Sequence, residues 1–308
     1  METINCDYCG NGDTVEIARG PDRYHGGPEV FTVVRCRACG LAYTNPRPDA
    51  AEMGRFYPED YGPYAGGGSP VIRRLKSLLL AGQLRLLRGL LPPGGRILEV
   101  GCAGGEDLAG LRDRGGWKVQ GVEMSPGPAS RARERYGLDV WTGNLDDAPL
   151  PDKAFDLIKM KYVLEHLPAP GRAFARVGSL LKPGGIFLIW VPNIASPFLS
   201  WFGSRWQGLD LPRHLFHFQP RTLGKYCARH GFEIVRIGYS PVPNGIINSI
   251  RFVLEEKTGR PHAWCDWTNP FLAALCLPLG IALALLRLSD RTLYVLRKSS
   301  GRPEKPGG

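Results

Sequence analysis

The chain has 308 residues, of which 43% are hydrophobic and 22% charged, and its formal net charge is +10. This composition is typical of a folded protein and excludes an intrinsically disordered one. Residues Met1 to Gly10 contain neither a basic start nor an apolar run, which predicts a cytoplasmic protein without a secretory signal. Eight cysteines in such a chain favour metal binding over disulfide bonds.

The positive charge is concentrated in two segments. Residues 71–91 contain five basic residues and no acid, and residues 287–308 contain six basic residues and two acids. Both segments adjoin leucine-rich sequence. A protein that binds nucleic acid usually spreads its basic residues over the binding face. The segregated charge therefore favours peripheral attachment to the inner face of a membrane, and makes nucleic acid a weaker hypothesis.

Two Cys-x-x-Cys-Gly pairs, separated by β-type runs such as Val30–Val34, occupy residues 1–45. Each pair has the spacing at which two thiolates meet one tetrahedral zinc ion. Chance burial of cysteines would not explain both copies of the pattern. We therefore predict a small domain that resembles a zinc ribbon, with a closed structural Zn²⁺ site. Its four ligands are Cys6, Cys9, Cys36 and Cys39.

Residues 46–91 are expected to form a linker followed by an amphipathic basic helix. The part up to residue 70 is rich in Pro, Gly and Tyr, and the helix occupies 71–91 until Pro92-Pro93-Gly94-Gly95 ends it. The linker contains Tyr57, Tyr61 and Tyr64. Tyrosines in such a linker act either as packing anchors or as a cover over a neighbouring site.

Residues 92–298 alternate short apolar strands with helical stretches, the pattern of βαβ units on a parallel sheet. We predict seven strands with helices on both faces, an apolar helical insertion at about 241–289, and a disordered tail at 299–308. The predicted strands are Arg96–Val100, Val119–Glu123, Val140–Trp141, Phe155–Lys159, Gly185–Val191, Glu233–Tyr239 and Thr292–Arg297.

The first of these strands runs into a glycine-rich turn and then a helix from about Glu106. Gly101 and Gly105 allow a tight bend and the close approach of a ligand to the backbone. Glu123 ends the next strand, where a carboxylate can accept hydrogen bonds from two ribose hydroxyls. The combination predicts a site for an adenosine-containing cofactor.

The loop and five later segments together resemble the class I S-adenosylmethionine-dependent methyltransferases, in particular members of types 11 and 23. The resemblance covers about Pro92 to Tyr239, and the order and spacing of the segments make it specific. It implies a Rossmann-like α/β fold and an enzyme that transfers methyl groups. The matching segments are Ile97–Gly105, Val122–Glu123, Gly143–Pro151, Phe155–Ile158, Val163–Leu167 and Leu181–Gly185.

The resemblance also implies which residues hold S-adenosylmethionine. The loop surrounds the methionine half, the acid after the second strand binds the ribose, and residues after the second and third strands meet the adenine. In that order the residues are Glu99, Gly101, Ala103 and Gly105; Glu123; and Met124, Asn144 and Leu145.

Two positions depart from the family pattern. Ala103 stands where a glycine is usual, and Asn144 stands where an aspartate is usual. An alanine is still small and an amide can still meet the adenine amino group. The alternatives to cofactor binding are a dead site on the same fold and a dehydrogenase. The dehydrogenase is disfavoured because residues 101–105 fit the Gly-x-Gly-x-x-Gly fingerprint poorly.

Methyl transfer from a sulfonium is an in-line displacement, so a base is needed only if the acceptor must lose a proton. His166 follows the fourth strand and serves either as that base or, with Glu165, as a loop residue near the cofactor. His214 is our first choice for a base that faces the acceptor, with Arg213 binding an anionic group. His217 is the alternative to it, and at least one of these two histidines is expected to be a packed, hydrogen-bonded core residue.

The insertion contains the 20-residue uncharged run Trp267–Leu286. Its apolar part, Phe271–Leu286, reaches about 24 Å as a helix, short of the roughly 30 Å hydrocarbon core. We expect an interfacial or buried hairpin, with Arg287 and Arg291 near anionic headgroups. A helical cap over the site and a dimer interface remain alternatives.

These features predict an enzyme that methylates a small-molecule, glycan or lipid-linked acceptor, with a sugar hydroxyl as one option. Two alternatives stay open. An RNA methyltransferase would use the ribbon and the basic segments to bind phosphate. A non-catalytic module would use the ribbon for partner contacts and the cofactor fold as a scaffold.

Overall fold

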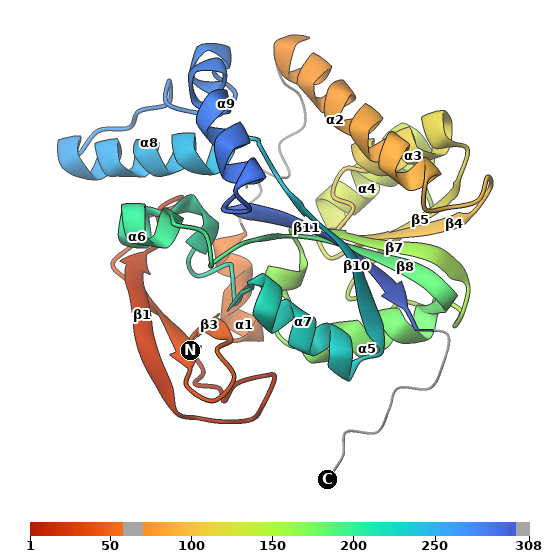
Figure 1. The fold of residues 1–308 in the computed structure, drawn as a ribbon, viewed down its shortest axis with the longest axis horizontal. Coiled ribbons are helices and arrows are strands. Elements are labelled where there is room, and N and C mark those ends of the chain that lie inside the picture. Colours follow the sequence, from red (N-terminus) through yellow and green to blue (C-terminus); the bar gives the residue numbers. More distant parts are fainter. Residues whose placement is uncertain (58–69, 300–308) are drawn as a thin grey trace.

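The structure is a computed structural model that describes residues 1–57 and 70–299, with side chains between 70 and 76 described only for Arg74. Its centre is a seven-stranded sheet of order β10-β11-β8-β7-β4-β5-β6 (Figure 1). The strands from β8 to β6 are parallel, whereas β11 is antiparallel to both neighbours. The strand bounds are β4 Arg96–Val100, β5 Lys118–Glu123, β6 Val140–Thr142, β7 Phe155–Lys161, β8 Leu181–Pro192, β10 Phe232–Tyr239 and β11 Arg291–Lys298. The predicted Rossmann-like fold is confirmed.

Helices cover both faces of this sheet, which explains why its central strands are apolar throughout. Ile97, Leu98, Leu157 and Ile158 are fully buried on β4 and β7. In Figure 1, α2, α3 and α4 lie above the sheet and α5 and α7 below it. Their bounds are α2 Pro70–Arg88, α3 Glu106–Gly115, α4 Pro126–Tyr136, α5 Pro170–Leu180 and α7 Pro220–Arg229.

The cysteine-containing segment forms a second sheet, which a later part of the chain completes. Its order is β1-β2-β3-β9, with all pairs antiparallel. Strand β9 lies between β8 and β10 in sequence and adds to the edge of β3, where Tyr43 pairs with Phe216. The predicted segment 1–45 therefore shares its sheet with the segment that contains His214. The bounds are β1 Thr14–Pro21, β2 Val30–Cys36, β3 Ala42–Thr44 and β9 Phe216–His217, and the short helix α1 follows at Ala50–Met53.

Between β10 and β11 the chain forms the helices α8 (Asn244–Thr258) and α9 (Pro270–Leu285), and the short helix α6 (Phe198–Phe202) packs against α8. Within α9 only Gly280 and Leu283 are buried. Leu283 joins a hydrophobic cluster with α6, and a Cβ at Gly280 would lie 2.2 Å from the Pro241 carbonyl oxygen. Among the described residues, no helix is both long and apolar enough to cross a membrane.

Some sequence-based expectations fall on residues that the structure does not describe. Tyr61, Tyr64 and the predicted tail from residue 300 onward lie outside the described residues. Tyr57 is the last described residue before that gap.

Candidate cofactor and acceptor site

The glycine-rich turn joins β4 to α3 through backbone that other residues rarely adopt. Gly101 and Gly105 have φ angles of 70° and 80°. A Cβ on Gly101 would lie 2.4 Å from Val163 Cγ2, and one on Gly105 would lie 2.6 Å from Leu138 Cδ1. Both glycines are therefore required by conformation and by packing. Ala103 between them has a φ of 47°, a left-handed conformation that is unfavourable for a residue with a Cβ.

Glu123 at the end of β5 reaches back to this turn. Its Oε2 accepts a hydrogen bond from the Ala103 N–H at 2.8 Å, and its Oε1 accepts one from the Ser125 N–H at 2.9 Å. Burial raises the pKa of the Glu123 carboxyl, although the backbone N–H groups act in the opposite direction. The two carboxylate oxygens are each anchored and retain lone pairs for further donors.

Glu99, at the end of β4, is paired with a lysine on the neighbouring strand. Lys159 Nζ is 2.7 Å from Glu99 Oε1, and both side chains are buried. The second carboxylate oxygen of Glu99, Oε2, is buried without a hydrogen-bond partner in the described chain. Asp107 on α3 extends the network, since its Oδ2 is 2.7 Å from Lys161 Nζ.

The predicted adenine-edge residues follow the next strands of the sheet. Met124 is exposed directly after β5, and Asn144 is exposed after β6, with its Nδ2 3.4 Å from Asp147 Oδ2. Leu145 is buried. The Gly143 N–H donates to the Glu123 carbonyl, which fixes the loop after β6 to the end of β5. All eight predicted cofactor residues thus lie at the carboxyl ends of β4, β5 and β6.

The structure brings the two predicted histidine candidates together, although 48 positions separate them in the sequence. The rings of His166 and His214 are 4.7 Å apart. Each Nδ1 lies beside a backbone carbonyl, of Arg213 at 3.0 Å and of Gly208 at 2.9 Å respectively. A carbonyl only accepts hydrogen bonds, so both Nδ1 atoms carry the proton and both Nε2 atoms present a lone pair. Tyr57 Oη also contacts His166 Nδ1 at 2.9 Å.

Glu165 completes this cluster. Its Oε1 is 4.0 Å from His214 Nε2, and neither carboxylate oxygen has a hydrogen-bond partner in the described chain. Burial raises the pKa of Glu165 to about 8 and lowers the pKa values of His166 and His214. The ligand atoms of the three residues lie within 4.8 Å of one another, a set that could hold a metal ion.

Arg213 does not take its predicted position. Its guanidinium is fully buried, and Nη1 and Nη2 are each 2.8 Å from an oxygen of Asp22. Its Nε donates to Asp210 Oδ1 at 2.9 Å. Two carboxylates therefore occupy its donors, and it is not available to an anionic acceptor. His217 is buried as expected, with its Nε2 3.4 Å from Thr44 Oγ1.

Comparison with known proteins identifies the family. A family model described as a methyltransferase domain matches residues 72–237, more than half of the chain. The chain belongs to the class I methyltransferases. Residues of this methyltransferase are 30% identical over 156 positions to the malonyl-[acyl-carrier protein] O-methyltransferase of Serratia marcescens, covering 50% of this chain and 60% of that protein. They are 33% identical over 156 positions to the ubiquinone biosynthesis O-methyltransferase of Nitrosococcus oceani, covering 46% and 64%.

The methyltransferase thus spans about three fifths of the length of these relatives. Among solved structures, a putative sarcosine dimethylglycine methyltransferase from Galdieria sulphuraria superposes with a TM-score of 0.51 at 15% identity, covering 73% of this chain and 86% of that one. This likeness concerns the fold alone. A further relative, 33% identical over 147 residues, is named as a probable S-adenosylmethionine-dependent methyltransferase of Mycolicibacterium smegmatis. The predicted resemblance to this family is confirmed.

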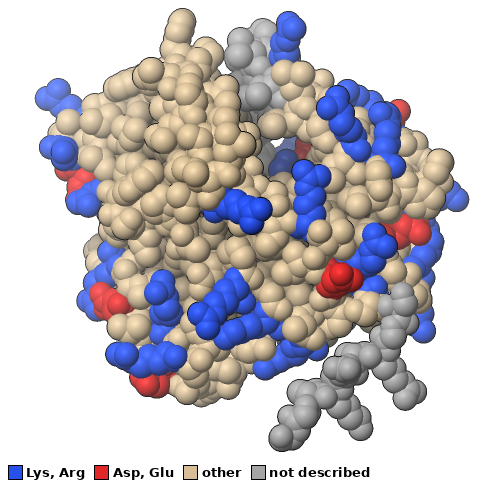
Figure 2. Space-filling view, viewed as in Figure 1, with Lys and Arg blue, Asp and Glu red and all other residues tan. Residues whose placement is uncertain are grey.

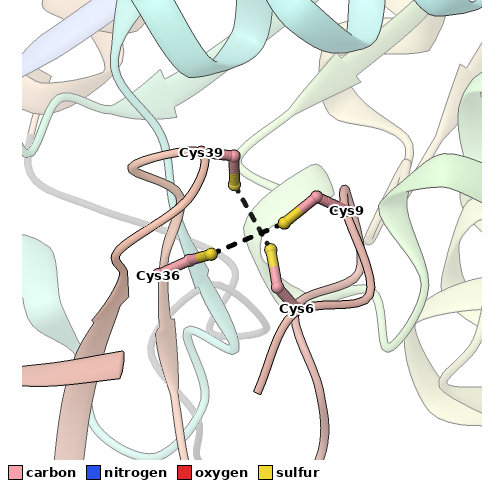
Figure 3. A group of neighbouring side chains, drawn as sticks. All are labelled: Cys6, Cys9, Cys36 and Cys39. Carbon is pink, nitrogen blue, oxygen red and sulfur yellow. Dashed lines mark hydrogen bonds between the residues drawn. The ribbon is translucent and has the colours of Figure 1, made fainter. Parts of the chain in front are cut away.

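The four predicted zinc ligands of the methyltransferase converge from two knuckles (Figure 3). The sulfurs of Cys6 and Cys39 are 3.4 Å apart, and those of Cys9 and Cys36 are 3.5 Å apart. These distances exclude disulfides, whose S–S bond is about 2.05 Å. Zinc–sulfur bonds of about 2.3 Å in a tetrahedron place sulfurs about 3.8 Å apart, so the four thiols fit a zinc ion with little movement.

Sequence reasoning missed the buried charges that support the site. Lys159 and Asp22 are buried, Asp210 is partly buried, and each pairs with a side chain in or next to the candidate site. A lysine inside the apolar strand Phe155–Lys161 is a signal that could have pointed to a buried acid on the next strand. For Asp22 the sequence carries no comparable signal, since its partner lies 191 positions away.

Proposed function

We propose that this protein transfers the methyl group of S-adenosylmethionine to a small-molecule, glycan or lipid-linked acceptor. The main support for the proposal is the hydrogen bond from the Ala103 N–H to the Glu123 carboxylate, which holds this acid against the glycine-rich turn. We assign Glu123 to the ribose hydroxyls, and the loop residues Glu99, Gly101, Ala103 and Gly105 to the methionine half. Met124, Asn144 and Leu145 are assigned to the adenine.

The donor set fits this cofactor. Glu99 Oε2 is a buried acceptor without a partner in the described chain, as a contact for the cofactor's amino group requires. Bound S-adenosylmethionine supplies an electrophilic methyl group on a sulfonium. The protein's part is to align the acceptor in line with that methyl group and to keep competing water away.

We assign proton removal from a hydroxyl acceptor to the pair His214 and His166. Burial lowers the pKa of both imidazoles, so both are neutral at pH 7 and present an Nε2 lone pair. Asp210, whose Oδ2 lies 3.7 Å from His214 Nε2, stabilises the imidazolium that forms when the proton is taken up. The names of two relatives, one acting on malonyl-[acyl-carrier protein] and one in ubiquinone biosynthesis, support a hydroxyl or carboxyl oxygen as the acceptor atom.

Calorimetric titration with S-adenosylmethionine tests the cofactor assignment. Glu123→Ala is expected to weaken binding by about tenfold or more, because it removes charge-assisted hydrogen bonds to the ribose. Glu134→Ala is the matched control, since Glu134 is exposed on α4 and bonds only to Ser130 in the described chain. A wild-type protein that does not bind the cofactor would refute the enzyme proposal. Labelled cofactor incubated with lipid and aqueous fractions of a cell extract then identifies the acceptor class.

We further propose peripheral attachment to an anionic membrane through α9. Phe271, Leu275 and Leu285 are 83%, 75% and 79% exposed, and the helix carries no charge. In Figure 2 the visible face of the lobe formed by α9 is free of Lys, Arg, Asp and Glu. Arg287 at its end is exposed, whereas Arg291 is stacked over Tyr162 and is not available to headgroups. An exposed apolar helix that ends beside an exposed arginine suits the interface of an anionic bilayer.

Flotation with vesicles of phosphatidylcholine, with or without phosphatidylglycerol, tests this attachment. The wild-type protein should float with the anionic vesicles, and the double variant Phe271→Ser/Leu275→Ser should not. Val235→Ser is the control, since Val235 is an exposed apolar residue on β10, away from α9. No flotation of the wild type, together with a dimer in light scattering, would instead assign α9 to a dimer interface.

A further inference from the structure

The candidate acceptor side of the site is not built by the methyltransferase sheet alone. Asp22 follows β1 in the cysteine-containing segment and is 3% exposed. Its two carboxylate oxygens accept hydrogen bonds from Nη1 and Nη2 of Arg213, each at 2.8 Å. A bidentate pair of this kind fixes the orientation as well as the position of the guanidinium. Asp22 also accepts from the N–H groups of Tyr24 and His25, so the carboxylate itself is held in place.

Arg213 transmits this constraint to both histidines. Its carbonyl oxygen accepts the hydrogen bond of His166 Nδ1, and its Nε holds Asp210. Asp210 Oδ2 lies 3.7 Å from His214 Nε2, and the Asp210 carbonyl accepts from the His214 N–H. The Asp22–Arg213 pair thus helps to fix the carbonyl beside His166 and the carboxylate beside His214.

The same segment of chain is held from a second side by β3. Thr44 Oγ1 donates to the His214 carbonyl at 2.7 Å, and the Thr44 N–H donates to the Leu215 carbonyl at 2.9 Å. The Leu215 N–H in turn donates to the Glu165 carbonyl at 2.8 Å. The cysteine-containing segment therefore holds the chain around His214 in two ways, through the buried ion pair of Asp22 with Arg213 and through the hydrogen bonds of Thr44 at the edge of β3.

We infer that Asp22 is a positioning residue that holds His166 and His214 in place through Arg213, which makes the cysteine-containing segment a structural part of the acceptor site. The inference rests on the proposed role of these histidines. It argues against the alternative in which this segment is a module independent of the site, because the segment supplies a buried contact to that site.

Long-range proton–nitrogen NMR correlations of the histidine rings test the inference, since they report which ring nitrogen carries the proton. His166 and His214 are assigned by His→Gln variants. In the wild-type protein both rings are expected as the Nδ1–H form. Asp22→Asn keeps the size of the side chain and removes its charge. It should convert His166 and His214 to mixtures of tautomers, while His262 and His230 keep their wild-type signals.

The control is Asp13→Asn, which removes an exposed acid of the same segment that pairs with Arg37. It should leave every histidine signal unchanged. Arg213→Lys is the second variant, because it keeps the charge and loses the bidentate geometry, and it should produce a smaller shift of the same two signals. S-adenosylmethionine affinity should stay within twofold of wild type in both site variants, because their contacts lie away from the glycine-rich loop.

Two results would overturn the inference. One is a wild-type spectrum in which His166 or His214, once assigned, carries its proton on Nε2, a result that does not depend on the Asp22 or Arg213 variants. The other is an Asp22→Asn protein that folds and binds the cofactor with unchanged histidine signals. Asp22 would then only attach the cysteine-containing segment to the rest of the protein, without positioning the histidines. Failure of the cofactor titration is a separate outcome, since it refutes the enzyme proposal and leaves the histidine spectra informative.

Discussion

Lys159 on β7 stands opposite Glu99 on β4 in the register of the parallel sheet, and its Nζ is 2.7 Å from Glu99 Oε1. Both side chains are buried, so neither charge is screened by water. Burial raises the pKa of the Glu99 carboxyl, and Lys159 opposes that change. The lysine thus favours the ionised form of a carboxylate at the position where the proposed cofactor presents its amino group.

Replacing Lys159 by Met should therefore leave the buried Glu99 carboxylate without its ion-pair partner. We expect a loss of about 3–5 kcal/mol in the free energy of unfolding, measured by urea denaturation, because breaking one side of a buried pair leaves an uncompensated charge. Lys118→Met on β5 is the control, because Lys118 is exposed, and it should change the free energy by less than about 0.5 kcal/mol. The double variant Lys159→Met/Glu99→Leu should recover most of the loss. A single variant as stable as wild type would show that Glu99 is already protonated in the folded protein.

Ala103 offers a stabilising substitution. Its φ of 47° is left-handed, which costs a residue with a Cβ roughly 1–2 kcal/mol, whereas glycine adopts it freely. After the larger entropy loss of glycine on folding, Ala103→Gly should raise the free energy of unfolding by about 0.5–1 kcal/mol.

The matched control is Ala109→Gly, in the interior of α3, where the same substitution should destabilise by about 1 kcal/mol or more. Both values come from urea denaturation monitored by circular dichroism. If Ala103→Gly lowered the stability as Ala109→Gly does, the left-handed conformation at this turn would be refuted.

The fold was predictable because its signals are local. Strand β4 has the bounds predicted from the apolar run Arg96–Val100, and each of the other predicted strands matches an observed one within a few residues. The periodicity of apolar residues and the glycines of turns are patterns within a few neighbouring residues, and the order of the segments can be read directly along the chain. One sequence is therefore enough to detect them. The glycine-rich loop and the cysteine pairs were visible for the same reason.

The remainder of the site depends on contacts between distant parts of the chain. Asp22 and Arg213 are 191 positions apart, and nothing near either residue indicates the other. Arg213 therefore looked like an anion-binding residue until its partners were known. The two-residue strand β9, which pairs with β3 in the sheet of the cysteine-containing segment, is too short to give any periodic pattern. Pairing of this kind is decided by packing, and local sequence does not encode it.

The cysteine cluster predicts one zinc ion per chain. Metal analysis of the purified full chain should find about one equivalent, and Cys36→Ser should reduce it to near zero and lower the thermal midpoint, since a structural zinc contributes folding free energy. Cys276→Ser on α9 is the control and should retain the metal, because Cys276 lies outside the cluster. Two equivalents in the wild type, one of which survives Cys36→Ser, would assign a second ion to Glu165, His166 and His214.

Glu165 predicts how stability changes with pH. Burial raises its pKa from 4.5 to about 8 in the folded protein. Between these two values the folded state holds a proton that the unfolded state has released. The free energy of unfolding contributed by this group therefore falls as pH rises, by about 1.4 kcal/mol per pH unit at most. The contribution is fully present below pH 4.5 and is lost as pH approaches 8.

Glu165→Gln isolates this effect, because the amide keeps the size of the side chain and does not titrate. The three neighbouring histidines have lowered pKa values, which makes stability rise with pH up to about 6.5, but they are common to both proteins. The difference between variant and wild type should therefore grow in favour of the variant from pH 5 to 8, reaching a few kcal/mol in urea denaturation. Glu134→Gln, at an exposed position, should give a curve parallel to wild type. Parallel curves for Glu165→Gln as well would mean that Glu165 is ionised in the folded protein at neutral pH, held by a cation that the described side chains do not supply.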